Sequence, residues 1–196
     1  SDVYKRQISN RTDVIDRICR TPLMYAPHTE RAYSDVDYMI LGLIVEQVVG
    51  KRLDEYLQEG VYRRLGLERT GFRPLDIRTP PDLIAATELN GNTRDGNVGF
   101  GTRPDGSPVF IRTQTIRGQV QDEKAFYTMS GVSGHAGLFS TADDLGVLLQ
   151  LMSNEGMYQG REYFPADVQR RFLTPDGDSA TYGLGWRTNG YYYFHG

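Results

Sequence analysis

The feature that most constrains this fold is an apolar helix predicted over residues 35–50. Apolar side chains recur there at mostly helical spacing, Gln47 is a polar break, and Gly50 provides a typical C-terminal stop. The apolar positions wrap widely around the helix, so we expect it to be buried. A chain of 196 residues, of which 39% are hydrophobic, is long enough to cover it.

Two further helices are predicted on either side of this one. Residues 12–20 are expected to form a helix with Thr12 as its N-cap. Val14, Ile15 and Ile18 would lie on one face of it. Residues 53–65 are expected to form another, which ends at a glycine.

The last third of the chain combines helices with a hairpin. Ser140 or Thr141 is expected to cap a helix, and a later helix is expected to start at Pro165. Residues 182–187 and 191–194 are predicted as two strands around an Asn-Gly turn. The first of these helices carries an apolar stripe that we assign to the core: Leu145, Leu148, Leu149 and Met152.

Residues 72–130 are punctuated by prolines and by Asn-Gly and Asp-Gly turns. Long irregular segments inside compact domains are usually functional or disordered. We favour a functional segment, because apolar residues such as Leu83, Ile84 and Ile116 are placed to anchor it to a core.

Composition excludes several classes of function. The net charge is −3 and lysine and arginine do not cluster, so we expect no nucleic-acid partner. The chain has one cysteine and three widely spaced histidines, so neither an internal disulfide nor a metal site is expected, and no cofactor is implied. No apolar run approaches the roughly 20 residues that span a bilayer.

Two common catalytic motifs are missing from the sequence. None of the three lysines follows a serine by three residues, so Ser-x-x-Lys does not occur, and Lys-Thr-Gly does not occur either. The string nearest to Gly-x-Ser-x-Gly starts at Gly131 but has His135 where the second glycine belongs.

Three separated strings carry a resemblance to a known family. They are YSDVDYMILGLIVEQVVGKRLDEYLQEGVYRRLGLERTGF (residues 33–72), GVSGHAGLFSTADDL (131–145) and YGLGW (182–186). In this order they resemble serine hydrolases related to class C β-lactamases and penicillin-binding proteins. The strings ELNGNTRDG and RGQVQDEKAF resemble the penicillin-binding protein 4B-like subgroup.

The resemblance implies catalytic roles for Tyr33 and Asp35. Taken alone, the tripeptide that they enclose favours a packed tyrosine ring and an aspartate that only caps the next helix. In the family, the matching tyrosine moves the proton of the nucleophile, and its phenol needs nearby positive charge to act as a base at neutral pH. Asp35 stands where the wider family has asparagine. An ionised carboxylate only accepts hydrogen bonds, so this departure argues against amide-type substrate recognition, including β-lactam hydrolysis. The subgroup also carries aspartate there, as the resemblance implies, so the aspartate is compatible with activity.

The glycine-rich string offers weaker candidates. His135, with Gly134 beside it, would orient substrate, or it is a structural histidine bonded to backbone carbonyls in a tight turn; we favour the second interpretation. Ser133 is disfavoured as a nucleophile, because no base lies at a recognisable spacing. Asp122 and Glu123 would bind a cation or start a helix, and the helix start is favoured.

The family's third motif, Lys-Thr-Gly or His-x-Gly, helps to hold the substrate's carboxylate or oxyanion. His195 is a candidate for the first residue of this motif. The resemblance to the subgroup, however, implies a longer insertion before the His-Thr-Gly.

The resemblance implies an α/β (α+β) fold of the β-lactamase and transpeptidase type, of which this chain holds mostly the helical part and a hairpin of the antiparallel sheet. We expect residues 1–7 to be a non-native leader and residues 8–196 to be one partial domain, truncated at both ends. The nucleophilic serine and its lysine would then precede the chain, together with any membrane anchor.

The parent protein implied by the resemblance is a bacterial envelope enzyme, expected in the periplasm. It would transfer acyl groups from cell-wall peptides ending in D-alanine, or from small amides and esters, through a serine ester. The alternative is a non-catalytic envelope protein that uses the same fold to bind peptidoglycan or a protein partner. A third interpretation is an unrelated, mostly helical domain, in which Tyr33 and residues 131–140 would lie far apart. The sequence leaves the oligomeric state open.

We expect the chain on its own to have no hydrolase activity, because it lacks Ser-x-x-Lys. Incubation with a fluorescent penicillin should therefore leave it unlabelled. A covalent adduct on any serine of this chain, located by peptide mass spectrometry, would contradict that expectation.

Overall fold

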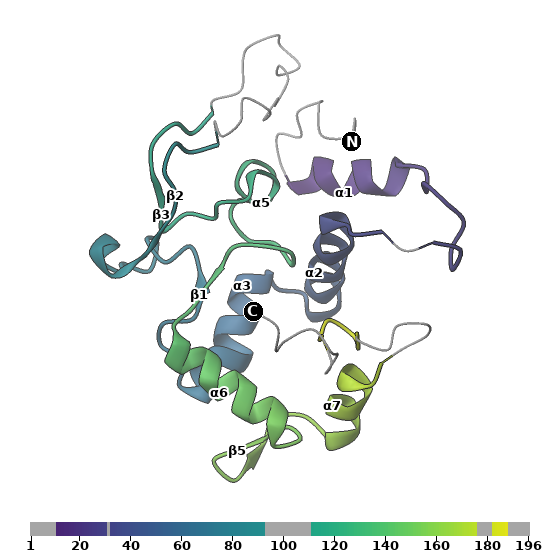
Figure 1. Cartoon of the computed structure of the whole chain (residues 1–196), viewed down its shortest axis with the longest axis vertical. Coiled ribbons are helices and arrows are strands. Elements are labelled where there is room, and N and C mark those ends of the chain that lie inside the picture. The colour runs from purple at the N-terminus through teal and green to yellow at the C-terminus, as the bar shows by residue number, and fades with distance from the viewer. Residues whose placement is uncertain (1–10, 31, 93–110, 176–181, 188–196) are drawn as a thin grey trace, which may run out of the picture. The chain divides into compact units, whose positions relative to one another are not determined.

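The computed structural model describes residues 11–30, 32–92, 111–175 and 182–187 (Figure 1). The chain divides into two compact units, Ser1–Ser140 and Thr141–Gly196. The expected leader at residues 1–7 lies outside the described part, and the expectation of one partial domain over residues 8–196 stays a prediction.

The first unit is mostly helical, with two short antiparallel strand pairs. β1 pairs with β4, and β2 pairs with β3. Its elements are α1 (Arg11–Arg20), α2 (Asp35–Val49), α3 (Leu53–Leu57), a π-helix (Gln58–Tyr62), α4 (Arg63–Leu65), β1 (Gly71–Phe72), a 3-10 helix (Pro81–Leu83), β2 (Ala86–Glu88), β3 (Ile116–Arg117), α5 (Glu123–Tyr127) and β4 (Leu138–Phe139).

The central helix α2 begins and ends as the sequence predicts. Ser34 is its extended N-cap, and Gly50 closes it in the left-handed conformation, with φ of 67° and its N–H donating to the Glu46 carbonyl. The expected burial holds on one face only, because Ile44 and Val48 on another face are 51% and 79% exposed.

Two apolar clusters pack against the buried face of α2. In the first, Val14 of α1 and Met129 lie against Met39, while Ile15, which was expected on the same face as Val14, is 43% exposed. The second cluster joins α3, β1 and the glycine-rich segment, which is residues 131–140. Its buried members are Leu53, Phe72 and Val132. Burial of each large apolar side chain contributes about 1.5–3 kcal/mol, so these clusters fix the positions of the surrounding elements.

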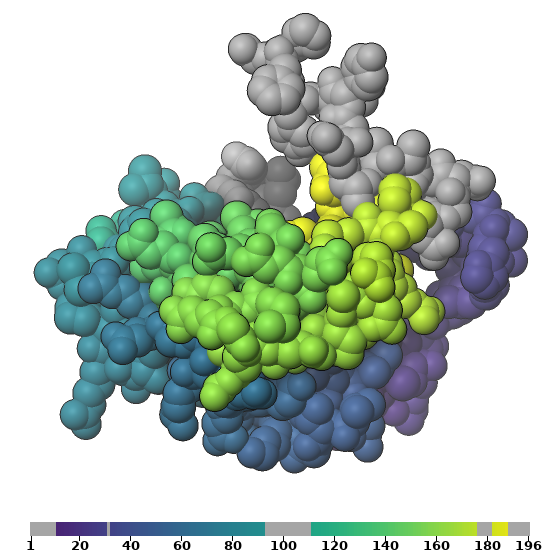
Figure 2. Space-filling model, turned by 90° about the horizontal axis from the view of Figure 1, so that it is seen from below, coloured from purple at the N-terminus to yellow at the C-terminus, as the bar shows by residue number. Residues whose placement is uncertain are grey.

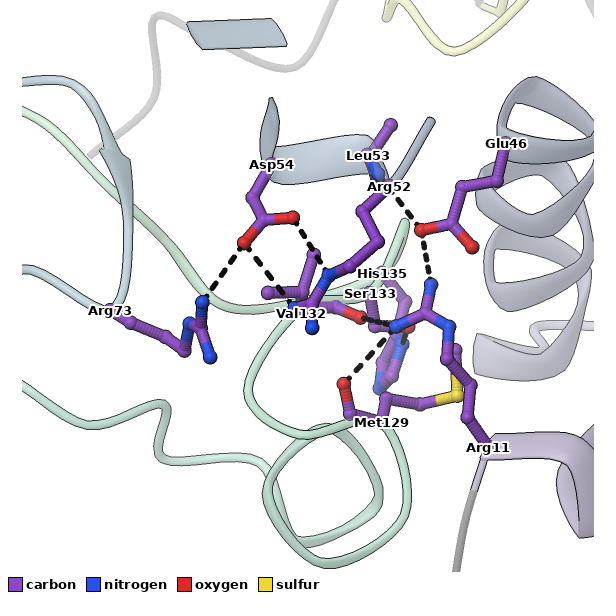
Figure 3. Close-up of polar contacts among 10 residues, drawn as sticks. All are labelled: Arg11, Glu46, Arg52, Leu53, Asp54, Arg73, Met129, Val132, Ser133 and His135. Carbon is purple, nitrogen blue, oxygen red and sulfur yellow. Dashed lines mark hydrogen bonds and ion pairs between the residues drawn. The ribbon is translucent and has the colours of Figure 1, made fainter. Parts of the chain in front are cut away.

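An ion pair reinforces the first cluster (Figure 3). Arg11 of α1 pairs with Glu46 of α2, and its Nη1 donates to the carbonyls of Met129 and Val132 at 3.3 and 3.1 Å. The Glu46 carboxylate also accepts the Leu53 N–H at 2.9 Å. Three helices and the glycine-rich segment are therefore joined through two side chains.

The irregular segment is organised by a buried arginine. Arg112 is 1% exposed, and its guanidinium donates to Asn92 Oδ1 and to the carbonyls of Val120 and Gln121 at 2.8–3.0 Å. The guanidinium carbon lies 3.7 Å from the centroid of the Phe126 ring. Of the apolar anchors predicted here, Ile84 and Ile116 are buried, whereas Leu83 is 66% exposed.

The second unit holds α6 (Ala142–Ser153), an antiparallel hairpin of β5 (Met157–Tyr158) and β6 (Arg161–Glu162), and α7 (Ala166–Leu173). Figure 2 shows these green to yellow segments side by side, and Gln169 of α7 donates to the Met152 carbonyl of α6 at 3.0 Å. Thr141 caps α6 by accepting the Asp144 N–H, as one of the two predicted caps. Pro165 precedes α7 as its N-cap.

Two expectations for this unit are wrong. Leu145 and Leu149 of the predicted core stripe are 46% and 56% exposed, and Leu151 is the buried residue of α6. Tyr182 pairs with Arg187 in an isolated antiparallel bridge, so residues 182–187 turn back on themselves instead of forming one strand. The partner strand predicted at residues 191–194 lies outside the described residues. Among the described helices, none is both long and apolar enough to cross a membrane.

The environment of Arg112 predicts a large effect on stability. We expect Arg112→Met to lower the free energy of unfolding by about 2–4 kcal/mol, because the buried Asn92 Oδ1 and Val120 carbonyl lose the guanidinium as donor. Urea unfolding followed by circular dichroism measures this change. Arg64→Met, on the exposed surface of α4, is the matched control and should leave the midpoint unchanged; equal midpoints for both variants would contradict the role assigned to Arg112.

Candidate active site

The candidate site begins at the N-terminal end of α2. The Tyr33 phenol donates to Asp35 Oδ1 at 2.9 Å, and Lys124 Nζ donates to Asp35 Oδ2 at 2.6 Å. The Tyr33 side chain is 95% exposed, so its ring is not packed in this structure. Ser34 is the N-cap residue, and Asp35 is the first residue of the helix. The interpretation of Tyr33 as a packed ring and Asp35 as only a cap is therefore wrong.

Hydrogen bonds shift the pKa values of Tyr33 and Asp35 in opposite directions. The bond to the Asp35 carboxylate raises the pKa of the Tyr33 phenol. The hydrogen bond from Lys124 lowers the pKa of Asp35, and the bond from Tyr33 acts in the same direction. At neutral pH the phenol is therefore protonated and the carboxylate is ionised, and the lysine ammonium lies on the carboxylate.

Lys124 is positioned by α5, whose start was predicted from sequence. Asp122 is the N-cap and its Oδ1 accepts the Ala125 N–H at 2.8 Å, as expected for a helix start. The same oxygen accepts a hydrogen bond from His135 Nε2 at 2.8 Å. Burial works to raise the pKa of Asp122, but these two hydrogen bonds and the nearby positive charge together outweigh it, and the pKa is lowered.

His135 has both ring nitrogens engaged. Its side chain is 4% exposed, Nε2 bonds Asp122, and Nδ1 bonds Ser133 Oγ at 2.8 Å. Because an ionised carboxylate can only accept, Nε2 carries a hydrogen. The partners are side chains rather than the backbone carbonyls expected of a structural histidine. A substrate-orienting role for His135 stays a prediction, and this geometry leaves neither nitrogen open to a ligand.

The serine, histidine and aspartate form a chain of hydrogen bonds that the sequence analysis missed. Ser133 was set aside because no base lay at a recognisable spacing, yet the imidazole of His135 contacts it directly. No sequence motif reveals this arrangement, because Ser133 meets His135 only through a local turn and Asp122 lies 13 residues before His135. Ser133 is 3% exposed, which argues against a nucleophile and for a buried polar support.

Gly134 brings this loop into contact with α2. A Cβ built on Gly134 would lie 2.0 Å from the Tyr38 carbonyl oxygen and 3.0 Å from the Gly42 N. Any side chain there would push the loop away, because such distances are far inside van der Waals contact. The close packing against α2 thus explains why glycine stands at position 134, while the substrate-binding role expected for Gly134 stays a prediction.

A hollow of about 480 Å³ borders the same loop, and Tyr62 in its wall is buried deeply enough that its pKa rises to about 12. The walls come from α2, α3, the π-helix, β1, β4 and the loop. The apolar side chains among them are Tyr38, Leu41, Val45, Leu53, Leu57, Tyr62, Phe72, Ala136 and Leu138.

Asp35, Asp122 and His135 each bring one carboxylate oxygen or ring nitrogen within 4.8 Å of the others, a spacing compatible with a cation site. Both ring nitrogens of His135 are nonetheless already engaged in hydrogen bonds. Lys124 Nζ is 2.6 Å from Asp35 Oδ2, so a side-chain ammonium already supplies positive charge there. His195, the candidate for the third motif, lies outside the described residues.

The sequence model of the family described as Beta-lactamase matches residues 1–196. The chain belongs to the β-lactamase family. Curated relatives agree with this membership. A protein of Escherichia coli named "Putative D-alanyl-D-alanine carboxypeptidase" is 52% identical over 181 residues, which are 92% of this chain and 40% of the relative. A protein of the same name from Salmonella gallinarum is 48% identical with the same coverage. The chain thus spans about two fifths of the length of these relatives.

Solved structures confirm the fold class of this β-lactamase family member. A penicillin-binding protein from Bacillus halodurans matches 93% of this chain and 46% of its own, with a TM-score of 0.56 and 19% identity. A D-amino acid amidase from Ochrobactrum anthropi matches 87% and 41%, with a TM-score of 0.53 and 16% identity. The interpretation as an unrelated helical domain is wrong, and His135 and Asp35 indeed lie close together.

The close approach of the loop to α2 predicts the effect of a single methyl group. Gly134→Ala should destabilise the first unit and move His135 away from Asp35, because its Cβ would overlap the Tyr38 carbonyl. Urea unfolding, together with the histidine ring signals in the NMR spectrum, measures both effects. Gly60→Ala is the control, since its Cβ would lie 3.7 Å from the Tyr56 ring in ordinary contact. Equal stability of the two variants would show that the approach is not a constraint.

Proposed function

We propose that this chain is part of a serine hydrolase that transfers acyl groups from peptides ending in D-alanine or from related amides and esters. The observation that carries the proposal is the exposed Tyr33 phenol bonded to Asp35 at the start of α2, in the position where the family resemblance implies a catalytic tyrosine. The names of the curated relatives support the choice of substrate.

The geometry favours a proton path through the tyrosine to the aspartate. A serine from another part of the protein attacks the carbonyl carbon and gives its proton to the Tyr33 oxygen, while the phenol passes its own proton to Asp35 Oδ1. The path then reverses and protonates the leaving amine as the C–N bond breaks. Water subsequently attacks the serine ester through the same pair, which releases the acid and restores the serine.

The aspartate makes this path different from one that starts with a phenolate. The Asp35 hydrogen bond raises the pKa of Tyr33, so the phenol rests protonated and needs an acceptor behind it. An ionised carboxylate at 2.9 Å is such an acceptor. Asp35 is thus proposed as the proton store of the site.

We also propose that the parent protein works in the bacterial envelope, in the periplasm. Cell-wall peptides, the proposed substrates, are found there, and the acyl-transfer step sketched above draws only on protein side chains and water. A substrate peptide is then its main partner.

The protein encoded by the full-length gene tests the proposal. Tyr33→Phe should lower kcat/KM for release of D-alanine from a D-alanyl-D-alanine peptide by about 10²–10⁴-fold, because the proton path loses its first oxygen. Tyr56→Phe, on α3 and outside the hydrogen-bonded site, should match the wild type. Failure of the wild-type protein to release D-alanine from such peptides and to hydrolyse related amides and esters would overturn the proposal. Retained binding to peptidoglycan would then favour the non-catalytic envelope protein.

A further inference from the structure

We propose that Lys124 is a positioning residue of this site, whose ammonium holds the Asp35 carboxylate so that its other oxygen accepts the Tyr33 phenol. The proposal deepens the proposed function and rests on it for the catalytic meaning of Asp35. The juxtaposition itself stands on the geometry, since Lys124 and Asp35 are 89 residues apart and in different elements.

The two carboxylate oxygens of Asp35 have different partners. Oδ2 accepts from Lys124 at 2.6 Å, and Oδ1 accepts from Tyr33 at 2.9 Å. One partner therefore fixes the rotation of the carboxylate and leaves the other oxygen facing the phenol. The Asp35 and Lys124 side chains are 22% and 27% exposed, so water screens this pair less than it screens a surface pair.

The charges around Asp35 show why a cation is needed. A ligand atom of Asp122 and one of His135 lie within 4.8 Å of the Asp35 carboxylate. Two carboxylates this close disfavour each other's ionisation. The groups that act on Asp35 are Tyr33, Lys124, Asp122 and His135, and the ammonium of Lys124 lies directly on Asp35 as a permanent positive charge at neutral pH.

The frame that carries Lys124 is itself fixed. Asp122 caps the first turn of α5, and Ala125 beside the lysine is fully buried. The Phe126 ring lies against the guanidinium of the buried Arg112. The lysine therefore starts from an anchored backbone, so only its side chain has to be ordered when it meets Asp35.

The consequence is a defined change on loss of the ammonium. Lys124 lowers the pKa of Asp35, so its removal should raise that pKa and keep the carboxyl protonated to higher pH. A protonated Asp35 can no longer take a proton from Tyr33. Activity should then be lost on the acid side of the pH profile at a higher pH than in the wild type.

The first test needs no catalysis and uses this chain. The titration midpoint of the Asp35 side-chain carbon, followed by ¹³C NMR, should rise by about one pH unit or more in Lys124→Met. Lys124→Gln serves the same purpose if the methionine variant fails to fold, and Lys124→Arg should keep the midpoint low. Lys51→Met is the control, since Lys51 pairs with Glu59 at 2.6 Å and should leave Asp35 unchanged. An unchanged Asp35 midpoint in both charge-removing variants overturns the proposal.

The second test uses the full-length protein. In Lys124→Met the acidic limb of the kcat/KM profile should move to higher pH by the same interval as the Asp35 midpoint, and Lys124→Arg should restore it. A uniform loss at every pH would overturn the proposal, because it indicates only a structural role. If the wild-type protein hydrolyses nothing, the proposed function fails, and the Asp35 titration in this chain still decides whether Lys124 controls that carboxyl.

Discussion

The candidate active site depends on one close approach between two stretches of backbone, the helix α2 and the glycine-rich segment. Gly134 lies so near to α2 that a methyl group would overlap the Tyr38 carbonyl, and a Cβ on Gly42 of the helix would lie 3.0 Å from the Gly134 N. Without that contact the loop could not bring His135 toward the start of α2, where Asp35 lies. Two residues that lack side chains therefore determine where the charged ones meet.

The charges that meet there form a compensated set rather than a simple pair. Asp35 and Asp122 each have a different partner, Lys124 and His135 respectively, and each carboxylate has a lowered pKa despite the other. At the other end of this network, Ser133 Oγ shares a hydrogen bond with Nδ1 of His135. Such networks keep their geometry only while every member is satisfied. The exposed phenol of Tyr33 is thus bonded to a partly buried network of interlocked side chains.

The sequence predicted features that local chemistry determines. Gly50 and Gly66 both end helices in the left-handed conformation, and Thr141 caps the helix that follows it. The position of the candidate site was also predicted, through the resemblance at residues 33–72. The contact between Lys124 and Asp35 could not be, because no spacing rule relates residues of different elements that only the tertiary fold brings together. Exposure of expected core residues was missed for the same reason, since burial depends on what lies opposite.

Oδ1 of Asp122 performs two tasks, accepting the Ala125 amide and His135 Nε2 together. This limits the variation that natural selection can accept at that position. Serine and threonine are good helix caps, but with them the histidine would lose its anionic partner. Asparagine has an oxygen at the same place, but it carries no charge. One atom thus ties the start of α5 to the orientation of the glycine-rich loop, so neither can drift independently during evolution.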